Sequence, residues 1–121
     1  MSYATQFGKW GEAYAGEYLE KQGIEIVARN VHTPFGEIDL VGREGVNLVF
    51  FEVKTRSSQT FGNPEDAVTP RKQEHLLNSA LYFMQQRPEE DGSWRIDVIS
   101  IIKSKSDGNP VQLEWFKNAV Q

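Results

Sequence analysis

The sequence predicts an α/β domain in which a mixed β-sheet is flanked by helices. Two segments repeat apolar residues at three- and four-residue steps, the spacing of amphipathic helices, and five shorter segments are rich in β-branched and aromatic residues, as strands are. Their order is α-β-β-β-α-β-β, and strands separated by a helix indicate a sheet that packs against helices. We expect residues 1–121 to form a single domain, because this length suits one compact unit.

The first helix is expected over residues 3–22. Its apolar positions share one face, and Gly23 follows where a left-handed C-terminal cap is typical. We interpret its aromatic side chains as core residues rather than as a surface for stacking bases. The apolar face is made by Phe7, Trp10, Tyr14, Tyr18 and Leu19.

Three strands are expected next, at residues 24–30, 37–43 and 48–56. The Thr-Pro-Phe-Gly sequence at 33–36 separates the first two as a turn, and a short glycine-containing loop separates the second from the third. Residues 57–64 are polar, uncharged and rich in turn formers, so we expect a loop there.

The second helix begins after Thr69, a favoured N-cap residue, with Pro70 at the first helical position. It is expected to run to about Arg87, because Pro88 and a charged run ending in glycine follow. The remaining segments are expected to be a strand at 94–102, a loop at 104–110 and a last strand at 111–116.

Composition excludes several classes of protein. The chain has no cysteine, so it has neither disulfides nor a thiolate zinc site. No apolar stretch approaches the ~20 residues that span a membrane, and the N-terminus lacks the pattern of a secretory signal, so we expect a cytoplasmic protein without a membrane partner. A net charge of −4 argues against tight, metal-free binding of nucleic acid, but it is compatible with carboxylates that bind cations.

The strands at 37–43 and 48–56 place charged residues together. Side chains alternate between the two faces of a strand, so Glu37 and Asp39 share one face, as do Glu52 and Lys54. If the strands pair as a hairpin in which paired residue numbers sum to 91, Asp39 lies opposite Glu52 and Glu37 opposite Lys54. A slip by one residue would bury the charged row, which favours this register. The reverse face would be wholly apolar, pairing Ile38 with Val53 and Leu40 with Phe51.

Two opposed carboxylates would repel each other unless a cation lay between them. Opposed Cβ atoms are ~5 Å apart, and Mg²⁺ is often held by one or two carboxylates together with water and phosphate oxygens. Lys54 would then reach an attacking water or the negative charge that develops on phosphorus. Solvated ion pairs on an exposed sheet face are the alternative, since an Asp followed by Glu-x-Lys is a loose pattern.

The strings GEIDLV at 36–41 and VFFEVKTR at 49–56 resemble those of the YraN-like proteins, uncharacterised protein family 0102. These proteins are similar to archaeal Holliday junction resolvases, and the resemblance implies the restriction-endonuclease-like fold. Further matching positions are Gly8, Gly11, Glu12, Gly23, Arg29, Asn30, Lys72, Leu76, Ala80 and the Arg95-Ile96-Asp97-Val98 string.

The resemblance implies a site in which Asp39 and Glu52 are metal ligands and the Val53 carbonyl is a third. Lys54 would be the catalytic lysine, and Glu12 would complete the metal site. The implied cofactor is Mg²⁺ or Mn²⁺, and the implied partner is DNA, branched or damaged, in repair or recombination. A twofold homodimer would suit a resolvase, which acts on two strands symmetrically.

Glu12 also has support from its surroundings. Gly8, Gly11 and Gly16 lie around it, and glycine inside a helix costs ~0.8–1 kcal/mol, so we expect another element to approach closely there. A solvated helix glutamate is the alternative interpretation.

Three residues are expected to support the site rather than to form it. Glu37 would hold Lys54 or assist a second metal, and Arg56 and Lys72 would contact phosphates. Arg71 is a further candidate for a phosphate contact, and surface solvation is the alternative interpretation for each of these three basic residues. By strand parity Thr55 is expected to be structural.

Other polar residues carry weaker expectations. Asp97 lies between apolar neighbours and is either a buried, hydrogen-bonded residue or part of the site edge. His32 and His75 have no paired ligand in the sequence, so neither predicts a zinc site or a general base.

Three functions are compatible with these patterns. The leading hypothesis is a Mg²⁺- or Mn²⁺-dependent endonuclease acting on DNA. The second is a non-catalytic nucleic-acid-binding or scaffold module with the same fold. A small-molecule hydrolase is the third. It would need an enclosed apolar pocket, and no feature of the sequence indicates one.

Overall fold

A computed structural model describes residues 3–57, 68–104 and 111–120. The predicted α/β class and element order are confirmed: a five-stranded mixed sheet with two helices, consistent with a restriction-endonuclease-like fold. The bounds are α1 Tyr3–Lys21, β1 Glu25–Thr33, β2 Gly36–Glu44, β3 Asn47–Arg56, α2 Pro70–Gln85, β4 Trp94–Ile102 and β5 Gln112–Val120.

Two strands extend three or four residues beyond their predicted ends. β1 continues to Thr33 and β5 continues to Val120. Most of the predicted loops at 57–64 and 104–110 lies outside the described residues. No helix in the described part of the chain is long and apolar enough to cross a membrane.

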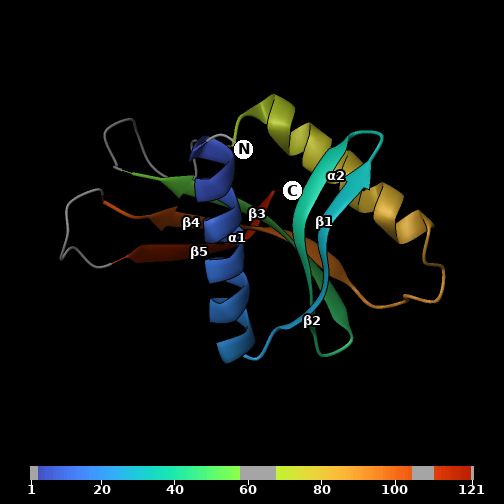
Figure 1. Cartoon of the computed structure of the whole chain (residues 1–121). Helices are drawn as coiled ribbons and strands as arrows, with labels where there is room; N and C mark the ends of the chain where they lie inside the picture. Colours follow the sequence, from blue (N-terminus) through green and yellow to red (C-terminus); the bar gives the residue numbers. More distant parts are fainter. Residues whose placement is uncertain (1–2, 58–67, 105–110, 121) are drawn as a thin grey trace.

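The strands follow one another across the sheet in chain order, β1-β2-β3-β4-β5 (Figure 1). β3 and β4 are parallel and all other neighbours are antiparallel. A parallel pair needs a long crossover, and α2 lies within that connection. The sheet is therefore mixed, as expected.

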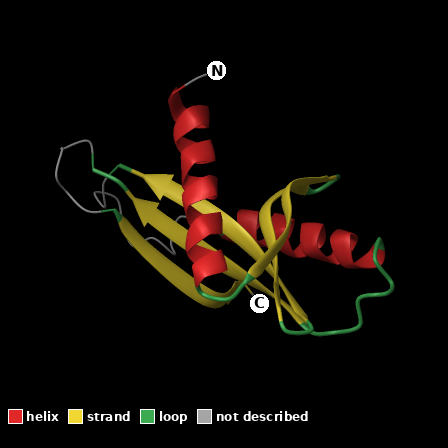
Figure 2. Ribbon diagram, turned by 60° about the horizontal axis from the view of Figure 1, so that its bottom comes forward, coloured by secondary structure: helices red, strands yellow, loops and turns green. Residues whose placement is uncertain are grey.

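The two helices cover opposite faces of the sheet (Figure 2). Neighbouring residues of β3 alternate between them: Phe50 packs toward α2 and Phe51 toward α1. Both faces of β3 are thus buried, which explains its continuous apolar run. On the α1 side, Trp10, Tyr14 and Tyr18 pack against the core, as predicted.

The glycines of α1 allow the helix to approach the sheet closely. A Cβ added at Gly11 would collide with the Thr55 side chain of β3, and one added at Gly16 would lie 2.7 Å from the Arg29 guanidinium of β1. Nothing lies within 4 Å of the corresponding position at Gly8, so the expectation of close approach was wrong there. Thr55 is structural, as its parity predicted.

The register predicted for β2 and β3 is confirmed over part of its length. Five pairs run from Glu44–Asn47 to Leu40–Phe51. Beyond them β2 pairs only with β1, to Thr33–Gly36, and β3 only with β4, to Arg56–Ile102. We call this divergence the fork: the opening between Ile38–Asp39 of β2 and Glu52–Lys54 of β3.

The expectation of one wholly apolar hairpin face was wrong at the fork. Ile38 packs in the core cluster beside α2, whereas Leu40 packs in the cluster beside α1, together with Val53. The alternation rule assumes a regular strand. Here Asn30, opposite this part of β2, has a positive φ of 50°, and the β1–β2 register shifts between Ile26 and Ala28. These irregularities distort the hairpin and turn it away from β3.

Candidate functional site

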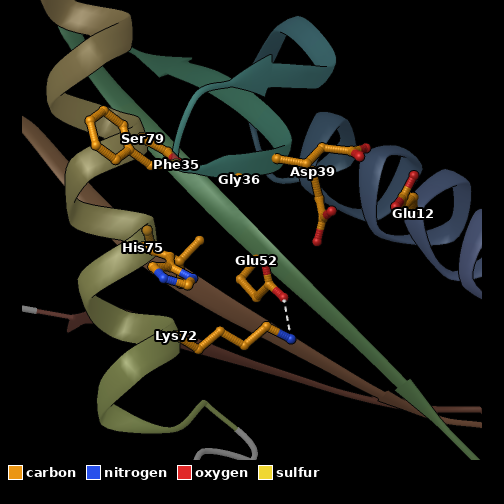
Figure 3. A pocket seen from close by; sticks show the side chains of 10 residues that line it. Glu12, Phe35, Gly36, Asp39, Glu52, Lys72, His75 and Ser79 are labelled. Carbon is orange, nitrogen blue, oxygen red and sulfur yellow. Dashed lines mark ion pairs between the residues drawn. The ribbon is translucent and has the colours of Figure 1, made fainter.

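A cavity of about 320 Å³ lies at the fork. Because the sheet is open there, side chains from helices on opposite faces reach the same space. Figure 3 shows Glu12 approaching from α1, Asp39 and Glu52 from the strands, and Lys72 and His75 from α2. The lining also includes Phe35 of the β1–β2 turn, Gly36 and Glu37 at the start of β2, and Leu76 and Ser79 of α2.

Asp39 takes the place of a missing strand pair. Ile38–Val53 would be the next hydrogen-bonded pair of the ladder, but the Val53 N–H instead donates to Asp39 Oδ2 at 2.8 Å. This bond fixes the carboxylate between the two strands. Burial, and then the charge of Glu52, raise the pKa of Asp39 to about 8, and the Val53 hydrogen bond only partly opposes them.

The Val53 carbonyl faces the same opening. The N–H and C=O of one residue point to the same side of a strand, so both groups of Val53 are directed at β2. Since its N–H meets Asp39, its carbonyl oxygen is directed at the fork as well. This is the orientation that the predicted third ligand requires.

Glu12 is brought to the fork by the close packing of α1. With the Asn30 amide oriented so that its nitrogen faces the carboxylates, it donates to Glu12 Oε2 at 3.0 Å and to Glu37 Oε1 at 2.8 Å. Burial raises the pKa of Glu12, and the charges of Glu37 and Glu52 raise it further. Glu12 is half-buried and lines the fork cavity.

Glu52 is flanked by two ammonium groups. Its Oε1 lies 3.5 Å from Lys54 Nζ and 3.3 Å from Lys72 Nζ, and the residue is 7% exposed. The expected pairing of Glu37 with Lys54 is not formed, because the β2–β3 ladder ends before it. Glu37 instead lies near Asn30 and 3.8 Å from His32 Nδ1.

The two lysines differ in how readily they lose a proton. Burial, followed by the neighbouring Lys72, lowers the pKa of Lys54. Burial acts to lower the pKa of Lys72 as well, but contact with Lys54 and the charge of Glu52 outweigh it and raise that pKa. Lys54 is thus the member of the pair that more easily becomes neutral.

The donor set fits a hard divalent cation in its chemistry. Glu12, Asp39 and Glu52 offer carboxylate oxygens from three different elements, and Val53 offers a carbonyl. A cation would replace the proton that the raised pKa keeps on Asp39. Within residues 3–57, 68–104 and 111–120, no three acidic or histidine side chains lie close enough to ligate one ion as they stand.

The sequence model of an uncharacterised protein family, UPF0102, matches residues 11–101. The chain belongs to this family. A UPF0102 protein of Syntrophomonas wolfei is 46% identical over 97 residues, 80% of this chain and 84% of the relative. UPF0102 proteins of Beutenbergia cavernae and Dehalococcoides mccartyi are each 42% identical, the first over 93% of this chain and 95% of the relative, the second over 99% and 98%.

UPF0102 membership confirms the resemblance that the strings at 36–41 and 49–56 predicted. Both strings lie within the matched residues, as do the three carboxylates and two lysines that meet at the fork: Glu12, Asp39, Glu52, Lys54 and Lys72. The family description names no activity, so it assigns no reaction to the site.

Several fork residues of this UPF0102 chain were not predicted. His75 and Ser79 follow Lys72 at helical spacing, so a polar stripe on α2 was the available signal. Asn30 sits within a strand, where asparagine is uncommon, and its tolerance of positive φ explains its place. Phe35 belongs to a turn whose position over the cavity no local pattern indicates.

The remaining predicted residues lie elsewhere. Arg56 ends β3 and does not line the cavity, although its parity puts it on the face of Glu52 and Lys54. Asp97 is fully buried and structural: it accepts hydrogen bonds from Arg95, from the Trp115 indole at 2.8 Å and from the Asn118 N–H at 2.7 Å.

Proposed function

We propose that this UPF0102 chain is a metal-dependent endonuclease that hydrolyses phosphodiester bonds in DNA, with Mg²⁺ or Mn²⁺ as cofactor. The observation that carries the proposal is the meeting of three carboxylates and two lysines at the fork, with the Asp39 pKa raised to about 8. Strongly shifted carboxylates beside cationic groups in a cavity are characteristic of catalytic sites.

Asp39, Glu52, Glu12 and the Val53 carbonyl would hold the cation. When bound, it supplies a Lewis acid that polarises the phosphoryl group and promotes ionisation of water. Lys54, the lysine with the lowered pKa, takes a proton from the attacking water. Lys72 stays protonated and offsets the negative charge that grows on the phosphate oxygens. The bond from phosphorus to the leaving sugar oxygen breaks, and that oxygen takes a proton from solvent.

A cleavage assay tests the proposal. The purified chain is incubated with Mn²⁺ or Mg²⁺ and with duplex, nicked, forked and four-way-junction DNA. We expect cleavage that EDTA abolishes and that Asp39→Asn and Lys54→Ala each reduce on the order of 100-fold. The matched controls Glu74→Gln on α2 and Lys21→Ala at the end of α1 remove exposed charges outside the cavity and should cut normally. No cleavage of any substrate, or equal cleavage by all variants, would contradict a nuclease.

A non-catalytic nucleic-acid-binding module is the second candidate. It is favoured by the contacts of Lys54 and Lys72 with Glu52, which neutralise that carboxylate without any metal. It predicts salt-sensitive DNA binding that neither Mn²⁺ nor Glu52→Gln changes.

A homodimer would allow two symmetric cuts at a junction, and sedimentation with and without junction DNA measures it.

A further inference from the structure

Phe35 is an exposed aromatic residue at the wall of the fork cavity. Its exposed fraction is 46%, and it is the one aromatic among the large, exposed hydrophobic residues of the described chain. The others, Val27, Val46 and Leu81, do not line this cavity. Phe35 differs from those three in that its ring lies at the wall of the cavity that also holds the carboxylates and Lys72, where a ligand bound in the cavity would meet it.

The turn that carries Phe35 is held firmly on α2. The Thr33 hydroxyl accepts the Phe35 N–H at 3.1 Å, donates to the Gly36 carbonyl at 2.7 Å and shares a hydrogen bond with the buried Ser79 hydroxyl at 2.8 Å. Gly36 has a φ of 139°, which side-chain-bearing residues rarely adopt. The ring is therefore presented on a fixed backbone, and little entropy remains to be lost when a ligand stacks on it.

The cavity that Phe35 lines is also lined by a lysine and a histidine of α2. Lys72 lies on α2, its Nζ 3.3 Å from Glu52, and His75 follows one turn later on the cavity wall (Figure 3). A ligand with both an aromatic face and a phosphate would meet Phe35 with one and Lys72 with the other. The cavity volume of about 320 Å³ is at the small end for ligand sites. It has room for one nucleotide rather than for a base pair with its neighbours.

From this geometry we infer that Phe35 stacks on an unpaired base next to the phosphodiester bond at the fork. The inference rests on the proposed function and narrows its substrate class. Bases inside a continuous duplex have both faces covered by neighbours, so they cannot reach the ring without unstacking. The preferred substrate is DNA with an unpaired or easily unstacked nucleotide: a single-stranded segment, a mismatch or a branch point.

Fluorescence of 2-aminopurine tests this inference, because stacking quenches it. One 2-aminopurine is placed at an unpaired position of an oligonucleotide or inside a continuous duplex, and each is titrated with protein in Mg²⁺. The protein carries Lys54→Ala so that substrate is consumed on the order of 100-fold more slowly during the titration. We expect quenching only at the unpaired position. Phe35→Leu should remove it and weaken binding of that DNA about ten-fold, because the stacking contact with the base is lost.

Two further variants test whether the aromatic ring of Phe35 causes the quenching. Phe35→Trp should restore the quenching, since it keeps an aromatic face. Leu81→Ala is the matched control, because Leu81 is also 46% exposed but lies outside the cavity, and it should change nothing. Equal weakening of paired and unpaired DNA by Phe35→Leu, or no weakening, would overturn the inference. A change in the sedimentation of the free protein would assign Phe35 to a protein interface instead.

Failure of stacking and failure of cleavage are distinguishable. If the wild-type chain cuts DNA with Mn²⁺ and Phe35→Leu leaves the ratio of unpaired to duplex cleavage unchanged, the stacking inference fails while the nuclease stands. If nothing is cut but the quenching depends on Phe35, the recognition stands while the nuclease fails.

Discussion

The carboxylate of Asp39 is half-buried beside Glu52 and Glu12, so at neutral pH it keeps a proton unless a cation replaces it. The uncharged group that hydrogen-bonds to this carboxylate, the Val53 N–H, belongs to the backbone. It is held in place and cannot move to stabilise the ionised form of Asp39. Because Asp39 loses this proton when the pH rises or when a cation binds, it couples the stability of the fold to pH and to metal binding. Both dependences can be measured without DNA.

Asp39→Asn should flatten the dependence of stability on pH. The folded-state pKa, about 8, lies above the ordinary value of 3.8. The stabilisation from this group is therefore fully present below about pH 4 and is lost as the pH rises through 8. In EDTA, we expect the wild-type free energy of unfolding by urea to fall by roughly 2–4 kcal/mol between pH 5 and pH 8.

The asparagine variant should lose much less over the same range, and Mn²⁺ at pH 8 should stabilise the wild type but not the variant. Equal losses in the two proteins would show that Asp39 is not the group that titrates.

Lys72→Gln should change the pH profile of cleavage rather than abolish activity. Lys72 lowers the pKa of Lys54, so its removal raises that pKa and leaves less neutral Lys54 at a given pH. We expect the rising limb of the rate to move to higher pH and the rate at pH 7 to fall roughly ten-fold. An unmoved limb with a uniformly lower rate would mean that Lys72 only binds phosphate.

At the scale of elements, the fork depends on how closely α1 can approach β3. Gly11 lies against Thr55, and this contact sets the height of Glu12 above the open edge of the sheet. A neighbouring glycine of the same helix, Gly8, has no such contact and provides an internal comparison.

Gly11→Ala should destabilise the protein although alanine is the better helix former. The added methyl meets Thr55, and such overpacking typically costs about 1–3 kcal/mol. Gly8→Ala should instead stabilise by roughly 0.5–1 kcal/mol, the usual gain within a helix. Urea unfolding of the two variants measures both signs, and Thr55→Ala should relieve the first. A stable Gly11→Ala protein would show that the contact is not tight.

Sequence alternation predicted the β2–β3 register and failed where the strands part. From Leu40 to Glu44 the register follows from which strand face is buried. The alternation of residue types within the strand itself encodes that choice of face. The fork depends on the positive φ of Asn30 and on the Asp39 side chain replacing a strand partner, and neither follows from periodicity. Glu37 was consequently assigned to Lys54, whose partner is Glu52.

At the scale of the whole molecule, the site exists because two helices on opposite faces meet at one opening. The sequence predicted both helices and the sheet, but from α2 it assigned only Lys72 to the support of the site, so His75 and Ser79 were missed. Glu12 was placed mainly by family resemblance, since packing between distant segments leaves little local signal. Asp97, in contrast, is a charged residue whose hydrogen bonds stabilise the fold and do not contribute to the site.

Asp97→Ala should destabilise the molecule without changing the site. Its carboxylate is fully buried and joins Arg95, Trp115 and Asn118 of β4 and β5, so its loss leaves donors unpaired and should cost about 3–5 kcal/mol. Calorimetry should show the lower Tm, while Mn²⁺ affinity per folded molecule stays unchanged. A selective loss of Mn²⁺ affinity would place Asp97 in the site.

The central claim is that the fork holds a divalent cation for phosphodiester hydrolysis, and a Mn²⁺-soaked crystal tests it most directly. We predict one anomalous-difference peak at ~2.0–2.2 Å from oxygens of Asp39, Glu52 and Val53, with Glu12 beside it and Lys54 released from Glu52. A crystal soaked in the same Mn²⁺ with no peak at the fork, and with Glu52 still paired to Lys54 and Lys72, would contradict it.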